Sequence, residues 1–531
     1  MKLNNDADWK DLFPYQEVRP EQDLAIRTAI EQLEHKKFFI LEAGTGVGKS
    51  AVGLTLAKYF QSAGDLGSYF LTTQKILQDQ YVSDFSNLGV RSIKSSTNFQ
   101  CKHHRKNTCA QSMRILKTAK KGSAFWNTCM FKCPYRNSKQ QFLDSKLSVT
   151  NFPYFLAESN YAKKITPRDF LVVDEAHNAP GELSKFIEIV ISEKFSRDFL
   201  NIKMPGIKTH KAAIEWIKEI YHPKLFRKFK HMEKKIEDFN LSSRLDEFTV
   251  LARQYEVIDK HLCKLNRFLE VHDYNNWIFN INSLGSFSKL EFKPIDIAPF
   301  ADQMLFRFGK KVLLMSATIL NKDGYCEMVG IKKEDAAFLH IDSPFDKKNR
   351  PILFFPVGRM VQKEIDRSLP ILAEAVSKII ENHKEEKGII HCHTFKIAKY
   401  LMQNIKSKRL LTHNSDNREE VLNRHKKSKK PTVLLSPSMT EGVDLAGDIS
   451  RFQILCKIPY PYLGDKLVSK KMNKWRWWYP LQTAKTVVQS VGRSVRNEKD
   501  HAVTYILDSD WESFHIRNRQ LFPSDFNSCI M

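Results

Sequence analysis

The chain has 531 residues, and its 84 Lys and Arg against 60 Asp and Glu leave a formal net charge of +24. A hydrophobic fraction of 42% is enough for packed cores and excludes general disorder, while only 20 Gly and 20 Pro exclude collagen-like and low-complexity classes. The basic excess favours a polyanionic partner, with nucleic acid ahead of a membrane surface; a basic surface kept for solubility is the alternative.

The N-terminal segment and the cysteines bear on the compartment. MKLNNDADWKDLF has no apolar stretch like that of a signal peptide, and no apolar run approaches the roughly 20 residues of a membrane-spanning helix. Nine cysteines, an odd number, argue against a disulfide framework and for a reducing compartment. We therefore expect a cytoplasmic protein, in the nucleoid or in a host cytoplasm if it is viral, that is neither secreted nor membrane-bound.

Strand and helix signals alternate through the first hundred residues. Lys37–Leu41 and Ser68–Thr72 have the composition of short buried strands. Helical spacing follows each of them, over Ser50–Phe60 and up to Tyr81. Strands that alternate with helices predict a parallel sheet with helices on its faces.

Two segments interrupt this pattern. Residues 101–146 carry eleven Lys or Arg against one acidic residue, a local charge of +10, and residues 181–285 are mostly helical in pattern. Strand signals return at Phe170–Val173 and Val312–Met315, and a second α/β region begins at about residue 340. Its predicted strands are Ile352–Phe355, Gly388–His391, Val433–Ser436, Phe452–Ile458 and Val503–Leu507.

This order predicts an α/β protein in which both interrupting segments are insertions into one unit. The first α/β domain is expected at 1–100, 147–180 and 286–335, and the second at 336–531. The insertions are 101–146, which is rich in cysteine, and 181–285.

A glycine-rich loop follows the first predicted strand and begins a helix. Its residues are Ala43, Gly44, Thr45, Gly46, Val47, Gly48, Lys49 and Ser50. In a phosphate-binding loop the backbone amides turn toward phosphate oxygens, the lysine reaches the β- and γ-phosphates, and the hydroxyl holds Mg²⁺. The loop therefore predicts an ATP site with Lys49 and Ser50 in these roles; a Gly-rich turn without a ligand is the alternative.

Three further stretches favour nucleotide hydrolysis. Asp174 ends a strand, where its carboxylate can hold the metal, and Glu175 can polarise the attacking water. Ser316-Ala317-Thr318 follows another strand and is either a relay or an ordinary loop. Arg493 and Arg496 are three residues apart, which predicts one shared helix face suited to a γ-phosphate. ATP would then lie between the two α/β regions, and its hydrolysis would open and close the cleft.

Taken in order, these motifs resemble those of superfamily-two helicases, with Asp174-Glu175-Ala176-His177 as the DEAH form. Other stretches resemble the XPD/DinG family of iron–sulfur DNA helicases, and the likeness spans about residues 13–511. They are Phe13-Pro14-Tyr15 with Arg19-Pro20-Glu21-Gln22, Thr72-Thr73 with Leu77-Gln78-Asp79-Gln80, Val149-Thr150-Asn151, Ser343-Pro344-Phe345-Asp346 with Asn349-Arg350, Glu441-Gly442-Val443-Asp444 with Gly447, and Ile458-Pro459-Tyr460-Pro461 with Gly464-Asp465. His393-Thr394-Phe395 is a loose match, and Asp508-Ser509-Asp510-Trp511 lacks the arginines that many relatives carry.

The resemblance implies two RecA-like parallel-sheet motor domains, the first carrying an Fe–S insertion and a helical arch at 181–285. It implies that Gln22 reads the adenine and that Asp444 belongs to the ATP site. The implied catalytic set is Lys49, Asp174, Glu175, His177, Gln489, Arg493 and Arg496, with Mg²⁺ on Ser50 and Asp174. Movement in the 5′→3′ direction is also implied.

Four of the nine cysteines fall within 33 residues of the basic insertion: Cys101, Cys109, Cys129 and Cys133. Clustered thiolates in a reducing compartment are typical of zinc or of an Fe–S cluster. The one close pair does not match the two short knuckles of most zinc ribbons, but His103 and His104 keep zinc open, and free structural cysteines are a third alternative. The resemblance favours one [4Fe–4S] cluster on the four cysteines, which would order an insertion too small to fold alone.

Binding of a single strand requires a cationic track with aromatic faces. The Cys-rich insertion has the charge and also Phe125, Trp126, Phe131 and Tyr135. The segment 474–479, KWRWWY, has the same mixture, but inward packing of its aromatic rings is slightly favoured over contact with nucleic acid.

The resulting hypothesis is an ATP-dependent DNA helicase, a monomeric motor on single-stranded and forked DNA. A DEAH-type RNA helicase or remodeller and a non-catalytic nucleic-acid scaffold are the alternatives. The Cys-rich insertion argues against the first of these, and the complete set of catalytic residues argues against the second. The sequence leaves DNA repair, R-loop removal and DNA replication open.

Overall fold

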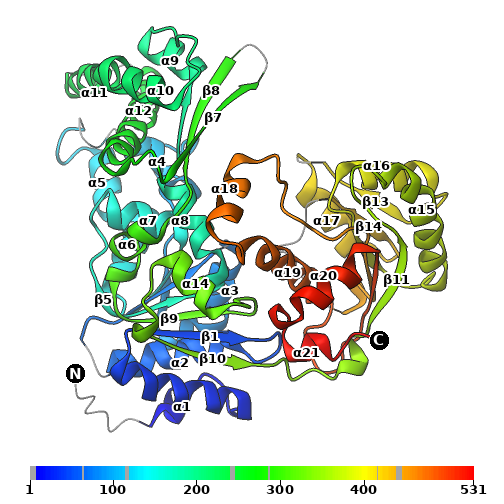
Figure 1. Ribbon diagram of the computed structural model, residues 1–531. Coiled ribbons are helices and arrows are strands. Elements are labelled where there is room, and N and C mark those ends of the chain that lie inside the picture. Colours follow the sequence, from blue (N-terminus) through cyan, green and yellow to red (C-terminus); the bar gives the residue numbers. More distant parts are fainter. Residues whose placement is uncertain are drawn as a thin grey trace.

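The computed structural model describes residues 8–62, 65–73, 75–113, 116, 119–238, 245–284, 287–414, 416–437, 445 and 447–531. In this part of the chain two α/β domains lie side by side, and a helical extension rises from the first of them (Figure 1). No helix in the described residues is long and apolar enough to cross a bilayer.

The first domain is built on a seven-stranded parallel sheet in the order β10-β1-β9-β5-β2-β4-β3. Its strands are β1 (Phe38–Ala43), β2 (Ser68–Thr72), β3 (Val90–Ser92), β4 (Leu147–Asn151), β5 (Arg168–Val173), β9 (Gly309–Ser316) and β10 (Ala336–Ile341). Its helices are α1 (Pro20–His35), α2 (Lys49–Ser62), α3 (Lys75–Phe85), α7 (Phe152–Asn160), α8 (Ala179–Ile187), α13 (Ala298–Met304) and α14 (Lys322–Val329). Strands β1, β2, β4 and β5 are buried along their whole length, which explains their continuous apolar runs.

The predicted boundary at residue 336 is wrong by one strand. β10 pairs in parallel with β1 along its whole length, so the first sheet continues to Ile341. The strand covers what would otherwise be an open sheet edge next to β1.

The second domain has a six-stranded sheet in the order β11-β16-β15-β12-β14-β13, again parallel. Its strands are β11 (Ile352–Gly358), β12 (Gly388–His391), β13 (Leu410–Thr412), β14 (Val433–Ser436), β15 (Phe452–Leu455) and β16 (Val503–Asp508). Its helices are α15 (Ile365–Asn382), α16 (Phe395–Asn404), α17 (Arg418–Lys427), α18 (Lys466–Lys474), α19 (Trp478–Val491), α20 (Asp510–Asn518) and α21 (Ser524–Asn527). The prediction of two parallel-sheet domains is therefore confirmed.

The arch is less helical than predicted. It contains α9 (Glu193–Leu200), α10 (His210–Trp216), α11 (His222–Glu237) and α12 (Leu245–Val271), as expected. It also has an antiparallel sheet of β6 (Ile189–Ser192), β8 (Phe287–Pro294) and β7 (Trp277–Leu284). β8 lies beyond residue 285, because the segment returns to the first domain as a two-stranded ribbon (Figure 1).

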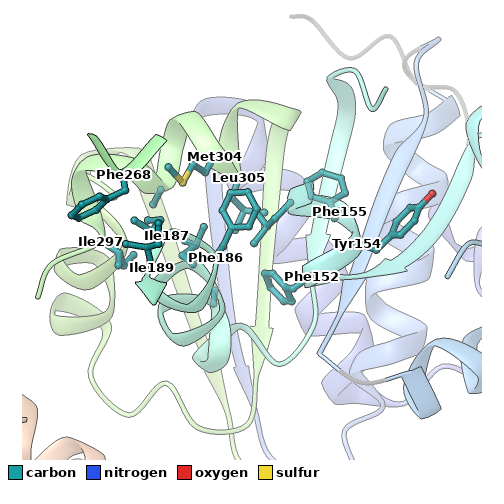
Figure 2. Close-up of a cluster of buried hydrophobic side chains, with 14 of the residues drawn as sticks. Phe152, Tyr154, Phe155, Phe186, Ile187, Ile189, Phe268, Ile297, Met304 and Leu305 are labelled. Atoms are coloured by element: carbon teal, nitrogen blue, oxygen red, sulfur yellow. The ribbon is translucent and has the colours of Figure 1, made fainter. Parts of the chain in front are cut away.

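One apolar cluster joins the arch to the first domain. Figure 2 shows Phe152 and Phe155 of α7 close to Phe186 of α8, with Phe268 of α12 and Ile297 on the arch side. All belong to one buried cluster, so the arch shares a core with the first sheet instead of hanging from a linker.

The Cys-rich insertion is partly anchored on the first sheet as well. It contains α4 (Cys109–Ser112), α5 (Ala124–Phe131) and α6 (Pro134–Asp144). α6 packs on β3 and β4, and its Phe142, 1% exposed, stacks at 6.1 Å from Tyr69 of β2. The end of the insertion is thus part of the first domain.

The segment 474–479 packs inward, as slightly favoured from the sequence, with Trp475 and Trp478 buried. It does so against the other domain. Trp475 Nε1 donates to Glu327 Oε1 of α14 at 2.7 Å, and Lys474 Nζ pairs with Asp296 at 2.6 Å. These contacts join the two α/β domains on the side of the arch.

Arg168 is predicted to be a major source of stability in the first domain. It is 5% exposed, lies 4.2 Å over the ring of Tyr69, and donates to Ser68 O, Ser148 Oγ and Leu143 O at 2.8 to 3.0 Å. Arg168→Met leaves these acceptors unpaired and should lower the free energy of unfolding by about 3 kcal/mol in a urea titration. The exposed Arg91 is the control, and Arg91→Met should change the free energy of unfolding by less than about 0.5 kcal/mol. Equal effects of the two substitutions would contradict the assignment.

Candidate active site

The glycine-rich loop connects β1 to α2 at the carboxyl end of the first sheet. Gly46 and Gly48 have φ of 97° and 86°, a region that favours glycine. A Cβ on Gly46 would lie 2.3 Å from the ring of Phe345, so the loop is also crowded from the second domain's side. Lys49 begins α2, and its Nζ donates to Ala43 O at 2.9 Å, which holds the ammonium inside the loop.

Two carboxylates end β5 beside this loop. Asp174 is 7% exposed, and Tyr81 Oη donates to its Oδ2 at 3.1 Å while lying 2.9 Å from Ser50 Oγ. Tyr81 therefore brings together the two groups predicted to hold Mg²⁺. Glu175 follows with φ 52°, an uncommon conformation for a non-glycine residue, fixed by its backbone N–H on Asp174 Oδ1 at 2.9 Å.

Burial shifts the pKa values of the charged residues around the phosphate loop. It lowers the pKa of Lys49, against the opposing pull of Glu175 and Asp174. It also raises the pKa of Asp174 to about 7, with the Glu175 carboxylate adding to the effect. Three charges of both signs thus lie together in a water-poor site, an arrangement typical of functional centres.

His177 connects three of the predicted motifs. Its Nδ1 lies 2.8 Å from Ser316 Oγ and 3.3 Å from Glu175 Oε2. Gln489 of α19 donates to His177 Nε2 at 2.8 Å and to Thr318 Oγ1 at 3.1 Å. Burial lowers the pKa of His177 well below its usual range, so the ring is neutral and can accept from Gln489.

The two arginines reach the same space from the second domain. A cleft of about 500 Å³ is lined by Arg493, Arg496, Glu175 and the loop residues Gly44 and Thr45. The predicted shared helix face is wrong, because α19 ends at Val491 and residues 493–496 form a turn and an extended stretch. A turn still brings both guanidinium groups to the cleft.

A second cavity, of about 640 Å³, lies on the other side of the loop and is lined by Gln22, Gly48, Ser50 and Asp174. Tyr15 and Phe85 also line it, with their rings 6.1 Å apart. Gln22 Oε1 accepts from the backbone of Arg19 at 3.0 Å, which begins α1, and Arg19 in turn donates to Gly46 O at 2.7 Å. This cavity has the aromatic walls and amide that a nucleobase requires.

The remaining predicted positions differ in how far the structure describes them. Val47 is buried under the loop and contacts the core of the first domain. Asp444 lies outside the described residues. Tyr81, Ser343 and Phe345 contact the site, although the sequence predicts no role there for any of them. A tyrosine one helix after the loop is the signal that could have indicated Tyr81.

The four clustered cysteines converge around one small gap of the insertion. They are 2% to 8% exposed, and the Cys109 and Cys133 sulfurs lie 3.2 Å apart. Hydrogen bonds from Cys109 and Cys129 lower the pKa of the Cys133 thiol. In the described part of the chain no three His, Cys, Asp or Glu side chains are spaced to hold one metal ion. Four buried thiols without a carboxylate fit a soft metal or cluster by their chemistry, although these two sulfurs would have to move apart.

Known proteins resemble the chain over nearly its whole length. Residues 376–526 match the model of a helicase C-terminal domain, and residues 15–204 match that of the type III restriction enzyme res subunit. The ATP-dependent DNA helicase DinG of Photobacterium profundum is 28% identical over 41% of this chain, a match that covers only 34% of that relative.

Two archaeal relatives match more of the chain. A probable ATP-dependent helicase of Methanocaldococcus jannaschii is 22% identical over 97% of this chain and 96% of its own. The ATP-dependent DNA helicase XPD of Sulfolobus acidocaldarius is 23% identical over 72% of this chain and 73% of its own.

Solved structures show the same fold. An XPD helicase superposes with a TM-score of 0.64 at 18% identity, covering 97% of this chain and all of that one. The Xpd4 protein of S. tokodaii gives 0.59 at 17%, covering 96% and 99%. With the motifs gathered around one cleft, these likenesses support an XPD/DinG-like ATP-dependent helicase.

Proposed function

We propose that the protein is a DNA helicase that moves 5′→3′ along single-stranded DNA and separates duplex at a fork, as a monomeric motor. The observation that carries the proposal is the cleft in which Glu175 and the phosphate loop of one domain face Arg493 and Arg496 of the other. An ATP bound there contacts both domains, so its hydrolysis can change the position of one domain relative to the other.

Different residues of the first domain bind the phosphates, hold the metal ion and orient the attacking water. Lys49 and the loop amides bind the phosphates, and Ser50 and Asp174 would hold Mg²⁺, which neutralises charge on the phosphates. The Tyr81 contacts to both Ser50 and Asp174 support this pairing. Glu175, held above the sheet end by its left-handed backbone, orients and polarises the attacking water.

The second domain completes the site. Arg493 and Arg496 stabilise the charge that develops on the γ-phosphoryl group. Gln489 couples the second domain to the hydrolysis site of the first, because its side-chain amide contacts both His177 and Thr318.

The Cys-rich insertion and the arch are proposed to guide the DNA. The insertion has a charge of +10, and Phe131 of α5 is 68% exposed with Trp126 at 6.0 Å from it. An exposed ring within a basic surface suits stacking on an unpaired base. The arch, fixed to the first domain by a common core, would form the opposite wall.

The four cysteines are proposed to bind a [4Fe–4S] cluster. Thiolates from Cys101, Cys109, Cys129 and Cys133 would hold it, and it would supply a rigid crosslink within the insertion. The support is the donor set, four buried thiols around one gap, together with the family likeness.

The main test is strand displacement with 5′-tailed, 3′-tailed and forked DNA on iron-replete protein. The protein should unwind the 5′-tailed and forked substrates with ATP and leave the 3′-tailed substrate intact. Lys49→Ala should abolish ATP hydrolysis while DNA binding changes little, because the loss is confined to the phosphate site. Unwinding of only the 3′-tailed substrate would refute the polarity, and stimulation by RNA instead of DNA would refute the substrate. DNA-stimulated hydrolysis by the Lys49→Ala protein would refute the assignment of the loop.

Gln489→Ala should separate ATP binding from turnover. Loss of the bridge between His177 and Thr318 should lower kcat for ATP hydrolysis about tenfold or more and change KM for ATP less than about threefold. Gln482→Ala on the same helix is the matched control, since the Gln482 side chain makes no contact across the cleft among the hydrogen bonds of the described residues. A rise in KM with unchanged kcat would show that Gln489 acts in binding only.

Cys101→Ser should reduce the iron content of the purified protein and its unwinding together. ATP hydrolysis without DNA should change little, because the phosphate loop lies in a different part of the first domain. Cys263→Ser, in the arch and outside the cluster, is the control. Unchanged iron content and unchanged visible absorbance in Cys101→Ser would exclude Cys101 as a ligand, and zinc in place of iron would exclude the cluster.

A further inference from the structure

A histidine lies between two carboxylates where the two α/β domains are joined. His340 is on β10, the last strand of the first sheet, and its Nδ1 is 3.0 Å from Glu42 Oε2. Its Nε2 is 2.9 Å from Asp342 Oδ1, on the first residues of the linker to the second domain. A ring whose two nitrogens both face carboxylates is held as an imidazolium, the form with two donors.

Glu42 ties this histidine to the phosphate loop and to the loop after β9. It stands two residues before Gly44, is 4% exposed, and is the register partner of His340 across β1 and β10. Its other oxygen, Oε1, accepts from the backbone N–H of Leu320 at 2.6 Å. Leu320 has φ 61°, so the carboxylate holds a strained turn just beyond Thr318.

The linker that follows His340 runs along the phosphate loop. Gly44 N donates to Ile341 O at 2.9 Å, and Ser343 Oγ donates to Thr45 O at 2.7 Å. Phe345 then packs over Gly46 and, on its other side, against Val495 of the second domain. The linker thus lines the cleft between the loop and the segment that bears the two arginines.

The C-terminal helix α21 holds the linker from outside. Ser524 Oγ donates to Asp342 Oδ2, and Asp525 pairs with Arg350 at 2.9 Å. The Asp525 carboxylate also accepts from Ser343 N at 3.4 Å. Asp342 is therefore shared between the first domain, through His340, and the second, through α21.

We propose that His340, as a cation between Glu42 and Asp342, is a positioning residue that fixes the linker 341–345 against the phosphate loop and so sets the reach of Arg493 and Arg496 to ATP. The inference rests on ATP hydrolysis in the cleft, the first element of the proposed function. His340 acts on the spacing of the two domains and does not contact the nucleotide. Losing its contacts should therefore lower kcat more than it weakens ATP binding.

We call the contacts of His340 with Glu42 and Asp342 the latch. The strength of the latch depends on pH, because it requires the charged form of the imidazole. Hydrogen bonding to Glu42, and then to Asp342, raises the pKa of His340 from 6.5 to about 9. The charged groups that face it are those two carboxylates, with Asp525 and Arg350 one contact further away. Since the folded pKa is raised, the contribution of the latch is complete below pH 6.5 and is lost as the pH rises through about 9.

The test compares His340→Gln with His35→Gln, an exposed histidine at the end of α1. His340→Gln should lower kcat about tenfold or more while KM for ATP changes less than about threefold, since a misplaced catalytic group costs turnover. The wild type and His35→Gln should lose kcat at pH values near 9, and His340→Gln should lack that decline. Hydrogen exchange of the peptide 341–349 at pH 7 should be faster in His340→Gln alone.

Wild-type kcat and wild-type exchange in His340→Gln would overturn the proposal. So would a lowered kcat that keeps the decline near pH 9, because the role would then be structural only. If His340→Gln does not fold, Asp342→Asn, whose side chain is 44% exposed, should show the faster exchange. If the wild type hydrolyses no ATP with any nucleic acid, the proposed function fails, and the exchange measurement still decides on the latch.

Discussion

Strand order in the first sheet is the constraint on which the active site depends. In the order β10-β1-β9-β5 the loops after four neighbouring strands open on the same edge. They bring the phosphate loop, the turn after Ser316, Asp174 and the linker after Ile341 within contact of one another. Because parallel strands share a carboxyl edge, residues about 300 positions apart in the sequence, such as Glu42 and His340, meet there. The contacts of His177 with Ser316 and of Glu42 with Leu320 and His340 follow from this neighbourhood.

The same edge concentrates charge where water is scarce. Asp174 is buried and Lys49 is half-buried, and desolvation lowers the pKa of Lys49 and raises that of Asp174. Two partly desolvated groups of opposite sign stabilise each other only in part, so the site suits a ligand that brings its own charges of both signs. A nucleotide with Mg²⁺ has that character. The apolar strands beneath the site, which are buried along their length, offset the free-energy cost of desolvating these charges.

Sequence patterns predicted the two sheets because their strands are buried on both faces and read as short apolar runs, as at Phe170–Val173. The loop motifs were predictable because their chemistry depends on local order, as in the run from Gly44 to Ser50. The arch sheet was missed, since polar residues interrupt the apolar ones in β7 and β8 and one face of β8 is only half-buried. β10 was missed as part of the first sheet because its partner, β1, lies about 300 residues earlier, and no local pattern encodes such a pairing.

Contacts between the domains were the least predictable feature, because they join residues that are far apart in the sequence. Arg493 was placed on a helix because three-residue spacing is helical, whereas the chain leaves the helix at Gly492 and turns toward the cleft. Inward packing of Trp475 was slightly favoured from the sequence, but not that its indole N–H would donate to Glu327 of the other domain. Trp475 thus has its polar partner on the other domain, and Arg493 lines the cleft that Glu175 of the other domain also lines. Each domain keeps its own apolar core, and a cavity of about 500 Å³ lies between them, so the cleft can change its width without either core being opened. That is the property that a motor driven by ATP requires of its two halves.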